Sequence, residues 1–185
     1  MRLFIAIELP DDVKRLLGGL RVDITGARWL PTEQVHLTLA FLGEVDEANL
    51  ERLTRELARI RLPGFRLCLG GTGCFPDRRR PRVLWVGLEP QPRLKHLAAA
   101  VQEAVLACGI PREERPFSPH ITLARLRLSP SRGCDAFLDR PPEQQLPPFP
   151  VREFILFQSR LTPQGALHTP VRSFPLAGAD AVGGA

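Results

Sequence analysis

Two short motifs in this sequence combine histidine and threonine in the same order. Residues 36–39 read HLTL, and residues 120–123 read HITL. Both motifs lie in apolar stretches that predict β-strands, and successive side chains of a strand point to opposite faces. We therefore expect each motif to present its imidazole and its hydroxyl on one face and its apolar residues on the other. One such triplet is a common polar strand face, but two copies, one in each half of the chain, indicate two similar lobes that face each other across a cleft.

Two imidazoles beside two hydroxyls suit the metal-free cleavage of a phosphodiester. Histidine titrates near neutrality, so one ring can take a proton from water while the other gives a proton to the leaving oxygen. Threonine hydroxyls can donate hydrogen bonds to phosphate oxygens without adding charge. The candidate catalytic residues are therefore His36, Thr38, His120 and Thr122. The two motifs are nearly equivalent, so the residues alone leave open which histidine is the acid.

Other kinds of site fit the residues less well. Histidine ligands of a metal usually come with a third protein ligand, and the two remaining histidines do not supply one, so a metal site is the weaker alternative. The sequence contains neither G-x-S-x-G nor G-x-x-x-x-G-K-[ST], which argues against a serine hydrolase and a phosphate-loop protein. Four cysteines without a C-x-x-C pair indicate reduced thiols that pack as small apolar residues. We expect no metal and no other cofactor. The main alternative to an enzyme is a nucleotide- or RNA-end-binding module without catalysis.

The composition favours a globular protein with an anionic partner. The chain has 185 residues and a formal net charge of +5, and only Lys14 and Lys95 among its 25 basic residues are lysines. Arginine binds phosphate in a bidentate manner, so this balance suits a phosphate-containing ligand, although a codon bias toward arginine would give the same ratio. No apolar run approaches the roughly 20 residues of a membrane helix, and the N-terminus turns acidic too early for a secretory signal. We expect a cytoplasmic monomer that makes no membrane contact.

The elements that must position the two motifs mix strands with helices. Apolar runs predict strands at residues 2–8, 34–42, 65–70, 82–88, 119–128, 151–158 and 167–176. Helical periodicity predicts helices that begin near Asp11, Asp46 and Pro92. The remaining segments are expected to be a hairpin loop at 71–81, an irregular connection at 129–150 and a flexible tail at 177–185. Because hairpins are as frequent as strand–helix alternation, the sequence predicts one α+β domain with two lobes over residues 1–176.

The motifs and their flanks resemble the 2H phosphoesterase superfamily, which is named for its two histidines. More closely, the chain is similar to the bacterial and archaeal RNA 2′,3′-cyclic phosphodiesterase family, also called the 2′-5′ RNA ligase family. The segments that carry this resemblance, in the family's order, are RLFIAIELP at 2–10, VHLTLAFLGEV at 35–45, FPDRRRPRVLWVGLEP at 75–90, RPFSPHITLAR at 115–125 and EFILFQSRL at 153–161. One departure is His168, at a place where relatives often carry an aromatic residue such as tyrosine.

The resemblance implies a bilobal α+β fold, in which two pseudo-symmetric antiparallel sheets with outer helices surround a central cleft. It implies hydrolysis of the 2′,3′-cyclic phosphate at an RNA 3′ end to a 2′-phosphate, with tRNA fragments or cyclic nucleotides among the candidate substrates and reversible 2′-5′ ligation as a related reaction. By family analogy His36 is the proton donor to the 3′ oxygen and His120 is the proton acceptor from water. Thr38 and Thr122 would then hold the non-bridging phosphate oxygens.

Four further residues are candidate substrate contacts. Arg125 belongs to the HITLAR block and is expected to meet phosphate charge, although strict alternation would place it opposite His120 unless a β-bulge intervenes. Arg80 and Arg82, in the basic cluster of the hairpin loop, are expected to hold the RNA backbone. Phe117 is the candidate for base stacking, whereas Phe4 is expected to belong to the core because of its strand.

Overall fold

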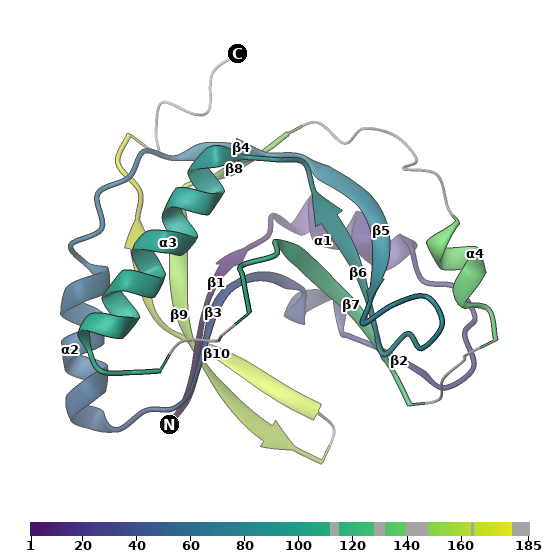
Figure 1. The fold of residues 1–185 in the computed structure, drawn as a ribbon, viewed down its shortest axis with the longest axis horizontal. Helices are drawn as coiled ribbons and strands as arrows, with labels where there is room; N and C mark the ends of the chain where they lie inside the picture. The colour runs from purple at the N-terminus through teal and green to yellow at the C-terminus, as the bar shows by residue number, and fades with distance from the viewer. Residues whose placement is uncertain (112–114, 128–131, 140–147, 164, 179–185) are drawn as a thin grey trace.

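A computed structural model describes residues 1–111, 115–127, 132–139, 148–163 and 165–178 (Figure 1). Its elements, in chain order, are β1 Arg2–Glu8, α1 Asp11–Gly19, β2 Ala27–Trp29, the 3₁₀ turn η1 Thr32–Gln34, β3 His36–Glu44, α2 Glu47–Leu57, β4 Phe65–Leu67, β5 Leu69–Phe75, β6 Val83–Leu88, α3 Pro92–Ala107, β7 His120–Leu126, α4 Cys134–Leu138, β8 Phe149–Val151, β9 Glu153–Thr162 and β10 Gly165–Pro175. The three predicted helix starts and the predicted strands that carry the two motifs are confirmed.

The strands form one large antiparallel sheet in the order β10-β9-β1-β3-β7-β6-β5, with β2 added beside β7, and a small second sheet of β4 and β8. The large sheet has two halves, because β3 and β7 pair at a single position, Leu37 with Ile121. Figure 1 shows the two halves side by side, with α2 and α3 along one half and α4 at the far end of the other. The α+β class is confirmed. The two expected sheets are present as the two halves, and their inner strands join them into one sheet at this position.

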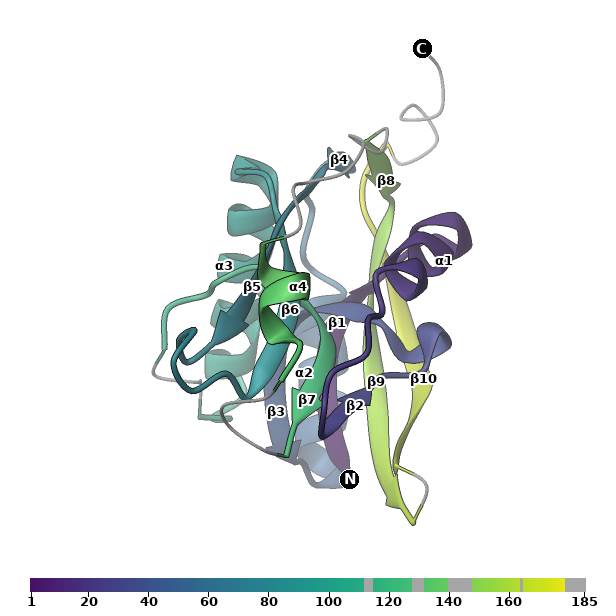
Figure 2. The same cartoon turned by 90° about the vertical axis from the view of Figure 1, so that its right-hand side faces the viewer.

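Local sequence signals set the helix ends as expected. Asp46 caps α2 by accepting a hydrogen bond from the Asn49 backbone at 2.8 Å. Gln91 caps α3, and Pro92 begins that helix, where its missing N–H costs nothing. The apolar stripes of the helices are buried in one core with the apolar strand residues, and Figure 2 shows α1 and α3 on opposite sides of the molecule.

The hairpin between β5 and β6 has a shorter loop than expected, because β5 continues through a glycine-rich segment to Phe75. A Cβ atom on Gly73 would lie 2.2 Å from the Trp85 ring, which faces Gly73 across the strand pair. Glycine therefore lets the indole lie against the strand, and the GTG sequence, which resembled a turn, is a strand.

Several short elements were not predicted. Residues 129–150 were expected to be irregular, but the described part of this stretch contains α4 and the start of β8. Helix α4 forms because Cys134 and Phe137 are buried, and the Phe137 ring lies 5.9 Å from that of Trp29. Strand β2, which carries Trp29, lies in a stretch where no strand was predicted, and it pairs with β7.

The first residue of the predicted tail is attached to the body of the protein. The Ala177 backbone N–H donates to the Leu62 carbonyl at 2.8 Å, and its carbonyl accepts from the Gly64 N–H at 3.1 Å. Residues 179–185 lie outside the described residues. Within the described parts of the chain, no helix has the length and apolar character needed to cross a membrane.

Candidate active site

The two motifs meet where the two halves of the sheet join. Leu37 pairs with Ile121, and strand alternation places the flanking motif residues, His36 and Thr38 on β3 and His120 and Thr122 on β7, on the face opposite to this buried pair. Both apolar partners are fully buried, whereas the four polar side chains are half-buried. The expected division into a polar and an apolar face is confirmed, and the polar faces of the two motifs lie on the same side of the joined sheet.

Each motif histidine is oriented in the same way. His36 Nδ1 lies 2.7 Å from the carbonyl oxygen of Gln34, and His120 Nδ1 lies 2.7 Å from that of Ser118. A carbonyl oxygen can only accept, so Nδ1 must carry the proton and donate it in both rings. The other nitrogen, Nε2, is thereby left for proton transfer, and the backbone holds each ring in place as a carboxylate does in other acid–base sites.

His36 is enclosed by rings from three other strands. Its ring centre lies 4.9 Å from that of Phe4 and 6.4 Å from that of Phe157, and His168 stands edge-on to it at 5.2 Å. Burial lowers the pKa of His36 to about 4, with a smaller lowering by the charge of His168 and an opposing effect of the Gln34 carbonyl. His36 is therefore neutral at pH 7 in the unliganded protein. Phe4 is a core residue, as expected.

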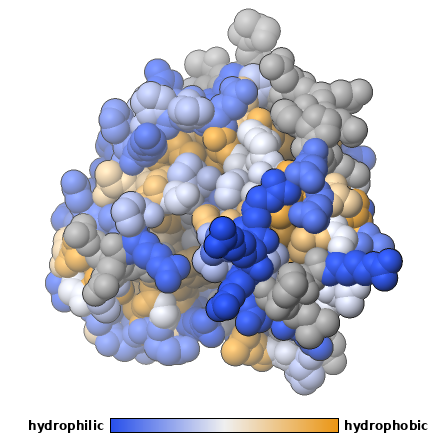
Figure 3. All heavy atoms as spheres, turned by 45° about the vertical axis from the view of Figure 1, so that its right-hand side comes forward, coloured by the Kyte–Doolittle hydropathy of each residue, from blue (hydrophilic) through white to orange (hydrophobic). Residues whose placement is uncertain are grey.

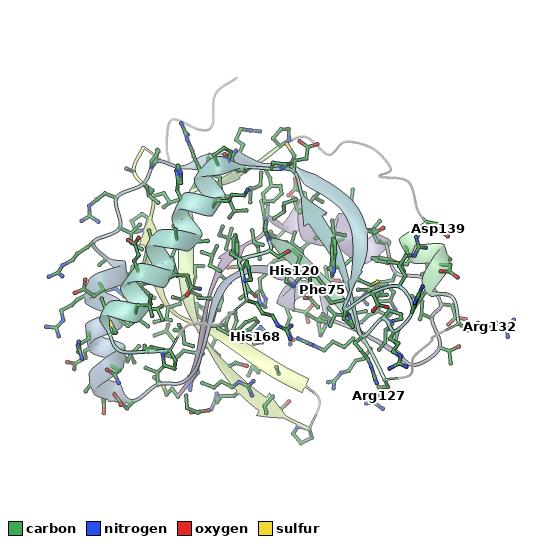
Figure 4. All side chains as sticks on the ribbon, in the orientation of Figure 1. Phe75, His120, Arg127, Arg132, Asp139 and His168 are labelled. Carbon is green, nitrogen blue, oxygen red and sulfur yellow. The ribbon has the colours of Figure 1, made fainter. Side chains whose placement is uncertain are left out.

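His120 lies against different rings, which come from the β5–β6 hairpin. Phe75 contacts it edge-on at 4.8 Å, and the Trp85 ring centre lies 6.3 Å away. Figure 4 shows His120, Phe75 and His168 in the centre of the molecule, where the two halves meet. Neither Phe75 nor Trp85 was among the predicted site residues. The available signal was the alternation of β6, which buries Leu84 and Val86 and places Trp85 on the other face.

A β-bulge returns Arg125 to the side of His120. The pairing of β7 with β6 shifts register between Ala124 and Thr122, so that Leu123 is an additional residue, and Leu123 and Ala124 are both buried. Arg125 is therefore exposed on the same face as His120 rather than on the opposite face. Strand β3 has the same irregularity and the same burial pattern at the matching position, where it exposes Phe41.

A pocket of about 320 Å³ lies beside His36. It is lined by Phe4, Glu8, Glu33, Gln34, Val35, His36, Phe157, Leu167, His168 and Pro170. The Nδ1 atom of His168 is buried and has no hydrogen-bond partner among the described residues, and burial lowers the pKa of this ring. His168 thus belongs to the wall of the site, although the sequence analysis noted it only as a departure from the family pattern.

The basic cluster between β5 and β6 is only partly neutralised. Arg78 binds Asp139 at 2.5 Å and lies 3.5 Å from Asp135, whereas Arg80 is exposed and Arg82 donates to the Arg127 carbonyl at 3.3 Å. In Figure 3, which turns this half forward, hydrophilic side chains gather on the surface with apolar ones visible between them.

Phe117, the predicted stacking residue, is half-buried and packs against the main core. It precedes His120 on the segment that leads into β7, so it helps to fix that segment. Among the described residues, no cluster of three histidine, cysteine or carboxylate side chains could hold a metal ion.

Comparison with known proteins places this geometry in a family. The family model described as LigT like phosphoesterase matches twice, over residues 4–85 and 86–168, so that each match contains one His-x-Thr motif. Two relatives named RNA 2′,3′-cyclic phosphodiesterase come from Thermus thermophilus, with 37% identity over 96% of this chain and 91% of the relative, and from Escherichia coli, with 33% identity over 95% and 96%.

Solved structures agree with the sequence comparison. A protein from Thermus thermophilus has a TM-score of 0.79 and 34% identity, and the match covers 96% of this chain and 99% of that one. Escherichia coli LigT in complex with 3′-AMP has a TM-score of 0.74 and 32% identity, with 95% and 98% covered. The duplicated family match, with one motif in each half, shows that this chain belongs to the LigT-like phosphoesterases of the 2H superfamily.

Proposed function

We propose that this protein hydrolyses the 2′,3′-cyclic phosphate at the 3′ end of RNA to a 2′-phosphate, without a metal ion. The observation that carries the proposal is the pair of imidazoles on adjoining strands, each with Nδ1 held by the carbonyl two residues earlier and with no partner for Nε2 among the described residues. The names of the relatives from Thermus thermophilus and Escherichia coli support the same reaction.

In the proposed reaction His120 Nε2 takes a proton from water, and the resulting hydroxide attacks phosphorus. The bond between phosphorus and O3′ breaks, and O3′ receives a proton from His36 Nε2. Thr38 and Thr122 donate hydrogen bonds to the non-bridging oxygens, and Arg125 offsets the charge that builds on them. The products are a 2′-phosphate and a free 3′-hydroxyl, and proton exchange with solvent restores both rings.

The proposed acid must gain a proton before it can act. Burial keeps His36 neutral at pH 7 in the unliganded protein, but a bound phosphate anion next to the ring favours the imidazolium. Substrate binding would therefore be accompanied by proton uptake at His36. In an in-line reaction the leaving O3′ and its ribose lie on the His36 side, so the adjoining pocket would receive the terminal nucleoside.

Replacing the bridging 3′ oxygen with sulfur tests the two roles separately. A thiolate leaves without protonation, so the loss of rate caused by His36→Ala should be largely abolished with the sulfur substrate, whereas the loss caused by His120→Ala should persist. His96→Ala, on the exposed side of α3, is the matched control and should behave as wild type with both substrates. If the sulfur substrate rescued His120→Ala instead, the two roles would be reversed.

In the proposed substrate the cyclic phosphate is the end of an RNA chain, so the protein should also contact the adjoining nucleotides. Arg80 and Arg82 would contact the backbone upstream of the cyclic phosphate, with Phe117 as the candidate for base stacking. Small 2′,3′-cyclic nucleotides, and tRNA fragments that end in a 2′,3′-cyclic phosphate, would offer the same reactive group. Reversible 2′-5′ ligation would follow from the same transition state, because ring opening by a ribose hydroxyl replaces attack by water.

A further inference from the structure

Lys14 is the one charged residue that is buried among those the structure describes. Its side chain is 9% exposed, and it is one of only two lysines in a chain whose other 23 basic residues are arginines. A buried ammonium is costly unless it is paired. The compact charge of the Lys14 ammonium also suits a small site that a planar guanidinium would not fit. The burial of Lys14 therefore indicates a specific role for its charge.

Both groups that the Lys14 ammonium contacts belong to residues close to His36. Lys14 Nζ donates to Glu8 Oε1 at 2.9 Å and lies 3.4 Å from the Glu33 carbonyl oxygen. Glu8 is paired with His36 across β1 and β3, so the two side chains share a face. Glu33 precedes Gln34, whose carbonyl accepts the hydrogen bond from His36 Nδ1. One ammonium thus contacts the carboxylate beside the imidazole and the turn that orients it.

We propose that Lys14 is a positioning residue for the reaction: it keeps the Glu8 carboxylate in an ion pair and away from the His36 ring, and it fixes the turn that holds Nδ1. His36 Nε2 is then left for the substrate. The inference rests on the proposed function only for the catalytic consequence, because the state of His36 can be measured without turnover.

The charges around His36 determine the direction of the expected effect. Glu8 on β1 favours the imidazolium, whereas Lys14 on α1 and His168 on β10 disfavour it. Glu33, on η1, also lines the pocket, and the rings that enclose His36 are uncharged apart from His168. Removal of the ammonium alone would leave the Glu8 charge unopposed, so it would stabilise the protonated ring and draw it toward Glu8.

The test is an NMR titration of the His36 ring in the full-length protein. Lys14→Met keeps the apolar stem and should raise the pKa of His36, because the Glu8 charge is then unopposed. Glu8→Gln should lower this pKa, and the double variant should return it close to the wild-type value of about 4. Lys95→Met, at an exposed position of α3, is the control and should leave it unchanged.

An unchanged His36 pKa in Lys14→Met, with only a loss of stability, would reduce the ion pair to a structural contact and overturn the inference. If Lys14→Met does not fold, Glu8→Gln, whose site is half exposed, decides alone, and an unchanged pKa there has the same meaning. Turnover is the second measurement: at pH 7, kcat should fall in Lys14→Met and recover in the double variant. A shifted pKa together with full activity of His36→Ala would contradict the proposed function and the catalytic consequence, but not the effect of Lys14 on the protonation of His36.

Discussion

At the scale of single residues, the backbone determines which nitrogen of each motif histidine can transfer a proton. The sequence predicts the residue types, their shared face and their pairing with threonine. It does not predict the low pKa of His36, because the rings that bury it come from β1, β9 and β10, which lie far apart in the chain. The contact of Lys14 with Glu8 cannot be predicted from the sequence either, although the two residues lie close together in the chain and shortly before the first motif.

The buried neutral state of His36 makes stability depend on pH. Its pKa is about 4 in the folded protein and 6.5 in the unfolded chain, so the unfolded chain binds the proton first as pH falls. The free energy of unfolding should therefore be highest above pH 6.5 and fall toward pH 4, by about 2 kcal/mol between pH 7 and 4.5 from this group. Urea unfolding of His36→Gln should show a shallower pH dependence, and His96→Gln should match wild type. If the free energy of unfolding of His36→Gln depended on pH as steeply as that of the wild type, groups other than His36 would cause the effect.

At the scale of elements, the β-bulge after each motif decides what lies beside the histidines. The alternation of a regular strand misplaces Arg125, and the structure corrects it through the buried pair Leu123 and Ala124. The signal is present in the sequence as an apolar Leu-Ala doublet after each threonine. A doublet is compatible with a bulge or with a strand buried on both faces, so only the pairing with β6 distinguishes them. Strands of three residues, such as β2, contain too few positions to show any period.

Arg125 on the histidine face should contribute to turnover. Arg125→Gln removes the charged donor that we propose for the phosphate, and such hydrogen bonds contribute about 1.5–3 kcal/mol, so kcat/KM should fall roughly 10- to 100-fold. Arg127→Gln, two residues later and also exposed, is the matched control and should change kcat/KM little. Equal effects of the two substitutions would indicate that only the general positive charge of this surface matters.

At the scale of the whole molecule, one residue pair joins the two halves of the sheet and sets the separation of the two motifs. Leu37 and Ile121 are fully buried in a core that continues through both halves. The two repeats can be predicted from the motifs and the composition of their flanks. Their fusion into one sheet cannot, because a single pairing position leaves no pattern in either strand.

Truncation at this junction should cost stability and activity together. Leu37→Ala should lower the free energy of unfolding by about 2–5 kcal/mol, since it opens a cavity in a fully buried site. It should also reduce kcat, because the separation of the histidines depends on this contact. Thermal unfolding and turnover, measured on the same preparation, give the two losses. Leu106→Ala, at an exposed position, is the control and should lower the free energy of unfolding by less than about 0.5 kcal/mol. Loss of stability without loss of kcat would show that the junction does not set the catalytic geometry.

The net charge of +5 acts at the same scale, and the exposed arginines of the β5–β6 loop carry part of it. The double substitution of Arg80 and Arg82 by Gln should weaken binding of an RNA oligomer and reduce its salt dependence by up to about two counterions. Turnover of a cyclic mononucleotide should stay close to wild type. The double substitution of Arg59 and Arg61 by Gln, beyond the end of α2, is the matched control. An equal loss with the mononucleotide would place Arg80 and Arg82 in the catalytic site instead.

The most direct test of the two-histidine mechanism uses a short RNA that ends in a 2′,3′-cyclic phosphate, in the presence of a chelator. The product is compared with 2′- and 3′-phosphate standards for the wild type, His36→Ala and His120→Ala. The mechanism predicts a 2′-phosphate from the wild type, and a loss of about 10²- to 10⁴-fold in each variant with the fold intact. Binding without turnover by the wild type, a 3′-phosphate product, or near-normal turnover by either variant would contradict it.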